Sequence, residues 1–181
     1  RVGSDLSTEL PEVEHRVPVL SLDKVYTSEE LHAWLERLKL RFPQQNLEII
    51  CEEKIDGVSI VLYYEDGLLQ RAVTRGNGRI GNDVTANIRT VRSVPMRLPR
   101  AASIAVRGEV FLYCADFKQL NQELETPFAN PRNLAAGTIR RVKSRQAAAV
   151  PLQFFAYELH TDEAISSHHR ALMELYRLGF P

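Results

Sequence analysis

A lysine between two carboxylates is the feature of this sequence that most directly indicates chemistry. Glu52, Lys54 and Asp56 lie two residues apart, and Gly57 follows them. A lysine amine is a nucleophile only in its neutral form, which desolvation or nearby cations favour. The carboxylates are suited either to binding ribose hydroxyls or to holding a magnesium ion. The alternative is a solvated strand end at a tight turn, where charged residues and glycine are common.

A glycine-rich segment with an arginine forms the second candidate. Residues 74–85 read TRGNGRIGNDVT, and backbone N–H groups of such a loop, together with Arg75, can cradle phosphate oxygens. The alternative is a flexible hairpin connection. The spacing of its glycines also matches the dinucleotide fingerprint G-x-G-x-x-G, but no acidic residue follows about 20 residues on, and Pro95 comes too early for a crossover unit. We therefore exclude a Rossmann fold.

Further candidates lie in the second half of the chain. Alternation along an expected strand puts Arg107 and Glu109 on the face opposite Val106 and Val110, which indicates either the wall of a site or a cross-strand ion pair. Arg132, in the first turn of an expected helix, is placed to reach a phosphate or to be merely solvated. In a later aromatic run, alternation along an expected strand puts Phe155 and Tyr157 on the face opposite Phe154. The aromatic rings of this run form either a surface on which a base stacks or part of the core.

The elements that must position these residues can be predicted from local signals. A capping box at Thr27 and Glu30 starts a helix that Pro43 closes, and its apolar spacing places Trp34 in a core. Alternation predicts a strand from Leu47 to Cys51; if it continues, Glu52, Lys54 and Asp56 share one face. Asp66-Gly67 predicts a hairpin between strands 58–64 and 68–74, which brings Arg75 back beside the start of the first strand.

The remaining signals complete a mixed α+β fold with mainly antiparallel sheets. Strands are expected at residues 103–112 and 152–159, and Asn130-Pro131 predicts a capped helix start. Residues 143–151 are expected to form a surface connection, and residues up to about Pro18 to be irregular. We divide the chain into a linker with the first helix, residues 1–45, and a core, residues 46–181.

Composition limits the class of protein. The chain has 181 residues with 23 basic and 23 acidic side chains, so its net charge gives no reason to expect tight nucleic-acid binding. Cys51 and Cys114 lie in apolar runs and are expected to be buried thiols in a reducing cytoplasm. The five histidines lack metal-ligand spacing. No apolar run is long enough for a bilayer, and the polar N-terminus lacks the core of a leader peptide, which predicts a soluble cytoplasmic protein without membrane contact.

Taken in order, five motifs resemble the adenylation domain of bacterial NAD-dependent DNA ligases. The motifs are Ser21-Leu22-Asp23, Glu52-x-Lys54-x-Asp56-Gly57, residues 74–85, Arg107-Gly108-Glu109 and Asn130-Pro131-Arg132-Asn133. The resemblance extends over nearly the whole chain. It implies a nucleotidyltransferase core of the type found in DNA ligases and mRNA capping enzymes.

The resemblance also implies a role for each matching residue. Lys54 is implied to be the lysine that accepts AMP. Glu52 is implied to contact the adenine side of the nucleotide, and Ser21 and Leu22 to line the NAD pocket. The other implied roles are as follows: Arg75 lies near the ribose and phosphates, Glu109 contacts the ribose, Asp56 supports the lysine motif, and Tyr157 stacks on adenine.

The implied reaction has three steps and uses NAD and magnesium. Lys54 displaces nicotinamide mononucleotide from NAD, AMP passes to the 5′-phosphate of nicked double-stranded DNA, and the 3′-hydroxyl then seals the nick in replication and repair. Asn77 and Asn82 depart from the family, which commonly has acidic residues at these positions. The chain also stops before the family's Asp-Gly-Val-Val-Ile-Lys strand, so we expect a truncated fragment that adenylates itself poorly or not at all.

Two rival readings remain open at this point. In the first, the same pocket is a non-catalytic NAD- or AMP-binding module, in which Lys54 only pairs with phosphate. In the second, Lys54 is catalytic but directs AMP or GMP elsewhere, as in ATP-dependent ligases and capping enzymes. The Ser21-Leu22 and Arg75-loop matches favour NAD.

Overall fold

The computed structural model describes residues 9–181, so residues 1–8, on which the expectation for the N-terminus falls, lie outside the described part. The chain divides into two compact units, one formed by the residues up to Val19 together with Lys54–Pro181, the other by Leu20–Glu53. Each unit is described by itself. Among the described residues, no helix is both long and apolar enough to cross a membrane.

The smaller unit contains one helix, α1 (Ser28–Arg41). Its predicted cap is confirmed: Thr27 Oγ1 accepts from the backbone N–H of Glu30 at 3.2 Å, and a Glu30 carboxylate oxygen accepts from the N–H of Tyr26 at 2.6 Å. The prediction that Trp34 is a core residue is wrong, because no residue of α1 is buried. A lone helix flanked by irregular chain offers its apolar stripe nothing within its own unit to pack against.

The predicted strand from Leu47 to Cys51 is also wrong. Residues 46–56 contain no regular element, and Ile49 and Ile50 are exposed. An alternating pattern makes a strand only where a partner strand takes up its N–H and C=O groups, and no described strand pairs with this segment. Cys51 is accordingly exposed rather than buried. Glu52, Lys54 and Asp56 therefore do not share the face of a strand.

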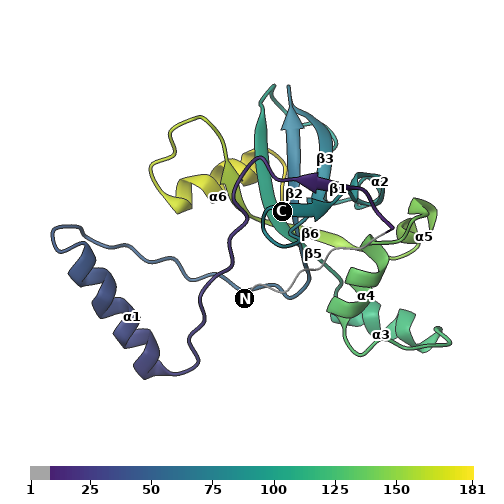
Figure 1. Cartoon of the computed structure of the whole chain (residues 1–181), viewed down its shortest axis with the longest axis horizontal. Helices are drawn as coiled ribbons and strands as arrows, with labels where there is room; N and C mark the ends of the chain where they lie inside the picture. Colours follow the sequence, from purple (N-terminus) through teal and green to yellow (C-terminus); the bar gives the residue numbers. More distant parts are fainter. Residues whose placement is uncertain (1–8) are drawn as a thin grey trace. The chain divides into compact units, whose positions relative to one another are not determined.

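The larger unit is built on a four-stranded antiparallel sheet in the order β3-β2-β5-β6 (Figure 1). The strands are β2 (Val58–Glu65), β3 (Leu68–Thr74), β5 (Ile104–Phe111) and β6 (Gln153–His160). The predicted hairpin is confirmed, with Asp66 and Gly67 at φ 49° and 78°, as a tight turn between right-twisted strands requires. The strands predicted at 103–112 and 152–159 are likewise present, displaced by no more than one residue at each end.

Side chains alternate between the two faces of this sheet. One face carries the main core, to which β2 contributes Val58, Ile60 and Leu62, and β5 contributes Val106 and Val110. Helices α2 (Thr85–Ile88), α4 (Pro131–Ile139) and α6 (His168–Arg177) add buried residues to this core. The opposite face carries a small cluster around Val61, Tyr63, Val73 and Ala105, and the polar residues of the candidate site lie on that same side.

The glycine-rich segment is ordered rather than a loose connection. β4 (Ile80–Asn82) pairs with β1 (Glu12–Glu14), so the expectation that residues up to Pro18 are irregular is wrong in part. Asn77 Oδ1 accepts from the N–H groups of Arg79 and Ile80, each at 2.9 Å. Asn82 is buried and donates to the carbonyl of Leu10. Asn77 thus holds the turn together, and Asn82 ties the end of the segment to Leu10. An ionised carboxylate at position 82 would face the Leu10 carbonyl without a proton to donate.

Two more helices lie before and after α4 in the sequence. The predicted cap of α4 is confirmed, because Asn130 Oδ1 accepts from the N–H of Asn133 at 2.8 Å and Pro131 is the first helical residue. Cys114 begins α3 (Cys114–Gln122), which has no buried residue, so its predicted burial is wrong. The expected connection at 143–151 contains a short helix, α5 (Ser144–Ala148), that packs against α2 and α4.

Candidate functional site

The start of β2 gathers Lys54 and Glu109 into one site. Ser59 of β2 lies opposite Glu109 of β5 in the antiparallel register, so residues just before β2 lie beside this part of β5. The backbone N–H of Gly57 donates to the Glu109 carboxylate. A Cβ on Gly57 would lie 2.1 Å from the carbonyl oxygen of Val110, so only glycine permits this close approach. The non-local register thus places the exposed Lys54 near Glu109, which is 6% exposed.

Glu109 is a buried carboxylate surrounded by cations. Burial raises its pKa above the usual range, and the positive charges of Lys54, Arg132 and Arg107 and the Gly57 N–H act in the opposite direction. A carboxylate in so dry a place accepts hydrogen bonds strongly, because few water molecules compete for it. The arrangement suits a ligand that brings hydroxyl groups to Glu109 while its anionic part faces the cations.

Asp56 and Arg132 form an ion pair at the edge of the same site. Arg132 Nη1 lies 2.7 Å from Asp56 Oδ1, and the two side chains are 50% and 74% exposed. A pair so open to solvent contributes at most about 1 kcal/mol to stability. Its consequence is positional, since it ties the first turn of α4 to the segment that carries Lys54.

A polar network continues along the same face of the sheet. Ser59 Oγ lies 2.9 Å from the hydroxyl of Tyr157 and accepts from Arg107 Nε at 3.2 Å. Arg107 Nη1 donates to Glu158 Oε2 at 3.1 Å, and the Arg107 guanidinium lies over the Tyr157 ring, 5.6 Å from its centroid. Glu158 Oε1 lies 3.0 Å from His160 Nε2. Contacts with Ser59, Glu158 and the Tyr157 ring thus fix the orientation of the Arg107 side chain.

Burial and these contacts shift two pKa values in the network. Burial raises the pKa of Tyr157, although the hydrogen bond with Ser59 opposes the shift. The hydrogen bond from His160 lowers the pKa of Glu158, with a further contribution from Arg107. Tyr157 is therefore a neutral phenol with Arg107 over one face of its ring.

Arg75 joins the site through the backbone and holds an unused donor. Its N–H donates to the carbonyl of Ser59 at 2.9 Å, which confirms the prediction that the hairpin returns it to the start of β2. Its Nε is buried and has no hydrogen-bond partner among the described residues. A buried donor without a partner is costly, so this atom fits an anionic oxygen of a ligand.

The sequence-predicted residues thus fall into two groups. Lys54, Asp56, Arg75, Glu109 and Tyr157 belong to the larger unit, where the structure brings Lys54, Asp56 and Glu109 together and places Arg75 and Tyr157 at Ser59. Ser21, Leu22 and Glu52 belong to the smaller unit, where all three are exposed, and their positions relative to Lys54 stay a prediction.

Sequence reasoning missed Ser59 and Glu158. Ser59 lies on the same face of β2 as Val61 and Tyr63, where alternation could have found it. Glu158 required the pairing of β5 with β6, in which it lies opposite Arg107.

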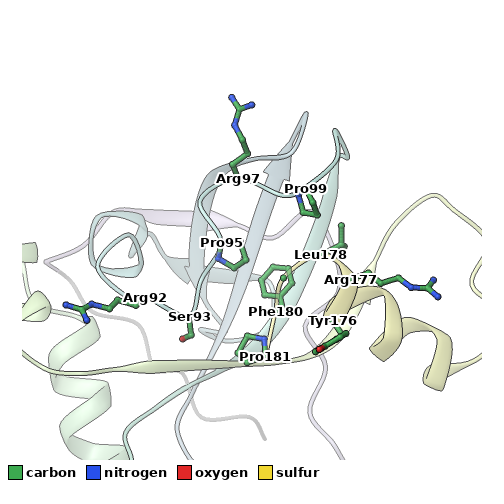
Figure 2. Close-up of a pocket in the computed structure, with 11 residues that line it drawn as sticks. Arg92, Ser93, Pro95, Arg97, Pro99, Tyr176, Arg177, Leu178, Phe180 and Pro181 are labelled. Atoms are coloured by element: carbon green, nitrogen blue, oxygen red, sulfur yellow. The ribbon is translucent and has the colours of Figure 1, made fainter.

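The described residues contain no cluster of three or more potential metal-ligating side chains. Two surface grooves lie elsewhere in the larger unit. One, of about 820 Å³, is lined by residues 92–99 and by the end of α6 with the residues that follow it (Figure 2). The other, of about 520 Å³, is lined by Tyr63, Ala105 and His160, among others. Neither includes Lys54 or Glu109.

Comparison with known proteins gives a consistent family. A family model described as the NAD-dependent DNA ligase adenylation domain matches residues 7–181. A DNA ligase of Borreliella afzelii is 47% identical over 181 residues, one of Borrelia garinii subsp. bavariensis 45% over 181 and one of Borrelia turicatae 44% over 183. Each alignment covers 99% of this chain and 27% of the relative, so the chain spans about a quarter of the length of the curated relatives it matches.

Proposed function

Because this chain belongs to the family of NAD-dependent DNA ligase adenylation domains, we propose that Lys54 accepts AMP from NAD as a covalent intermediate. The neutral Lys54 amine attacks the phosphorus of the adenylyl group. A P–N bond forms, the P–O bond to nicotinamide mononucleotide breaks, and that mononucleotide leaves with the bonding electrons while the amine loses a proton. In the whole ligase, AMP then passes to the 5′-phosphate of a DNA nick, and the 3′-hydroxyl displaces it.

The observation that carries the proposal is the pairing of exposed Lys54 with buried Glu109. Lys54 is accessible to a ligand, while Glu109 lies close enough for the two charges to interact. Glu109 is suited to accept hydrogen bonds from ribose hydroxyls, which would fix the adenylyl phosphorus relative to the amine. Arg75, with its unpartnered Nε, supplies a donor for a phosphate oxygen.

The remaining roles are assigned by the match of each residue to the family motif. We propose that Ser21 and Leu22 line the NAD pocket, that Glu52 contacts the adenine side and that Tyr157 stacks on the base with the ring face opposite Arg107. Asp56, which holds Arg132, supports the lysine segment. We also keep residues 46–181 as the nucleotidyltransferase core and propose a cytoplasmic location.

Any magnesium ion in the proposed reaction would be held mainly by the substrate. Magnesium typically keeps several water ligands and is held by substrate phosphates with one or two carboxylates. The described residues contain no cluster of three side chains that could ligate a metal. Their carboxylates therefore fit a magnesium ion held mainly by substrate phosphates better than one held by the protein alone. When bound, the ion would reduce the negative charge on the phosphate under attack.

A second candidate is a nucleotide-binding module without turnover. The exposure of Lys54, which is not enclosed by the fold, favours this candidate. In this alternative, Lys54 neutralises a phosphate and no bond forms.

Intact mass spectrometry distinguishes the two candidates. This chain, and a chimaera in which it replaces the matching 27% of the Borreliella afzelii ligase, are incubated with magnesium and either NAD or ATP. We expect an AMP adduct on Lys54 from NAD only, its loss in Lys54→Arg and its retention in Lys118→Arg, which alters an exposed lysine of α3. An adduct that persists in Lys54→Arg would refute Lys54 as the residue that accepts AMP, and the absence of an adduct in both proteins would leave the binding module.

A further inference from the structure

A histidine that none of the proposed roles uses lies beside the backbone of Arg75. His15 follows β1, and its backbone N–H donates to the carbonyl of Arg79 at 2.8 Å. Its ring Nε2 lies 3.0 Å from the carbonyl oxygen of Thr74 and 3.3 Å from that of Arg75. The other ring nitrogen, Nδ1, lies 2.9 Å from the hydroxyl oxygen of Tyr63. The ring is thus held at both nitrogens.

The hydrogen-bond partners decide which ring nitrogen of His15 carries the proton. A carbonyl oxygen can only accept, so the Nε2 that faces two carbonyl oxygens must be protonated. The oxygen of Tyr63 already accepts from the backbone N–H groups of Arg16 and Val17. Its own O–H therefore donates to Nδ1, which carries no proton. Burial raises the pKa of Tyr63, so this hydroxyl keeps its hydrogen.

The contacts of His15 hold the backbone on both sides of the Arg75 side chain. The N–H of Arg75 donates to the carbonyl of Ser59 at 2.9 Å, and its carbonyl accepts from the N–H of Gly78 at 3.0 Å. His15 donates to this carbonyl and to the preceding one, that of Thr74. Because peptide groups are planar, fixing the two that flank a Cα atom also fixes the direction in which its side chain leaves the backbone.

We propose that His15 is a positioning residue for Arg75, whose side chain it aims, through the backbone, at an oxygen of the NAD diphosphate. The inference rests on the proposed function, in which the Arg75 Nε, which has no partner among the described residues, donates to that oxygen. A donor that already points at the ligand avoids the entropy cost of ordering a long side chain on binding. In this role His15 does not contact Lys54. It should therefore affect the binding of NAD rather than the reaction of bound NAD.

Two substitutions of His15 separate the positioning role from a purely structural one. Asparagine ends near the place of Nδ1, so His15→Asn keeps an acceptor for Tyr63 and loses the donor to Thr74. Glutamine reaches about as far as Nε2, so His15→Gln keeps that donor and loses the acceptor. Each variant loses one of the two contacts, so both should melt at similar temperatures below the wild type. Only His15→Asn should weaken the binding of NAD.

The main test is the NAD dependence of the AMP adduct on Lys54 in the chimaera with the Borreliella afzelii ligase. We expect His15→Asn to raise the KM for NAD about fivefold, as the loss of one net hydrogen bond does, and to leave kcat within about twofold. His15→Gln should restore the KM of the wild type. The control is His32→Asn, which should change neither constant. His32 Nδ1 also lies 2.7 Å from a backbone carbonyl oxygen, that of Ser28, but on the exposed surface of α1.

Two measurements on this chain do not depend on the lysine chemistry. Heteronuclear NMR spectra of the histidine rings at about pH 8 should show His15 with a proton on Nε2 and none on Nδ1. Pyrophosphate, which stands in for the diphosphate of NAD, should shift the Nε–H signal of Arg75. His15→Asn should weaken pyrophosphate binding about fivefold, and His15→Gln should leave it at the wild-type value.

Several outcomes would overturn the proposal. They are a proton on Nδ1 of His15, no shift of the Arg75 signal with pyrophosphate, equal rises in KM for His15→Asn and His15→Gln, or a rise of the same size in His32→Asn. Failure of the proposed function gives a different pattern. No AMP adduct in the wild-type chimaera, with the expected tautomer and pyrophosphate affinities, would reject the lysine chemistry alone. A wild-type adduct with the same KM for NAD in every variant would reject the role of His15 alone.

Discussion

Glu158→Gln tests whether the network around Arg107 stabilises the larger unit. Glu158 accepts from Arg107 and lies beside His160, at 3.1 Å and 3.0 Å, and the side chains of Arg107 and Glu158 are 11% and 38% exposed. Exposed ion pairs contribute up to about 1 kcal/mol, whereas breaking a buried pair costs about 3–5 kcal/mol. Because the Glu158 carboxylate is partly exposed, the energy of this pair should lie nearer that of an exposed ion pair than that of a buried one. We expect Glu158→Gln to lower the free energy of unfolding by about 1–2 kcal/mol at pH 7.

The pH dependence of this loss has a definite sign. His160 and Arg107 hold the pKa of Glu158 below its usual value, so the folded state favours the ionised form. Such a group stabilises the fold above the pKa of the unfolded chain, about 4.3, and the stabilisation is lost as the pH falls through the lower folded value. The gap between wild type and Glu158→Gln should therefore be full at pH 7 and should close as the pH falls below about 4.3.

Urea unfolding followed by far-UV circular dichroism is the suitable measurement. The single tryptophan, Trp34, lies in the smaller unit, so circular dichroism of the strands is the more direct probe of the sheet. Glu163→Gln is the matched control, because Glu163 also accepts from an arginine, Arg100, but in a more exposed pair, and it should cost less than about 0.5 kcal/mol. Equal losses in the two variants, or a gap for Glu158→Gln that persists at pH 3, would refute this account of the network.

Two further predictions concern the lysine site itself. Glu109→Gln should leave the fold as stable as the wild type, or more so, at pH 7 and should weaken NAD binding. Because burial raises the pKa of Glu109, the ionised carboxylate costs stability at a pH above the unfolded-state pKa of about 4.3. Calorimetric melting curves of the two proteins should therefore converge below that pH. Gly57→Ala should lower the free energy of unfolding by about 3 kcal/mol, because the new Cβ would lie 2.1 Å from the Val110 carbonyl oxygen. The control is Gly137→Ala in α4, where the nearest atom to a new Cβ is 3.2 Å away. Its free energy of unfolding should stay within about 1 kcal/mol of the wild type in the same urea assay.

Features that depend on neighbouring residues could be predicted from the sequence. The Asp66-Gly67 turn requires only two residues that tolerate positive φ, and the Asn130 cap requires only a side chain three residues before the N–H that it accepts from. The failures depend on partners far away in the sequence. Leu47–Cys51 has the alternation of a strand but no strand to pair with, and Trp34 has the spacing of a core residue but no core in its unit.

The candidate site shows the same division between local and distant information. Alternation could place Arg107 and Glu109 on one face, but only the register of β2 with β5 brings Glu109 to Lys54, and only that of β5 with β6 brings Glu158 to Arg107. The roles proposed for Lys54 and Glu109 rest on the order of the motifs rather than on any single motif. Side-chain contacts between distant strands are set by the whole sheet, which no local pattern contains.

Opposite charges are balanced within the candidate site. Glu109 lies among the positive charges of Lys54, Arg107 and Arg132. Arg107 and Arg132 each have a further carboxylate partner, so part of the local positive charge is neutralised before a ligand arrives. For the proposed reaction, in which the site binds a nucleotide and then passes AMP on, this limited attraction is an advantage, because very tight binding of the ground state would slow the transfer.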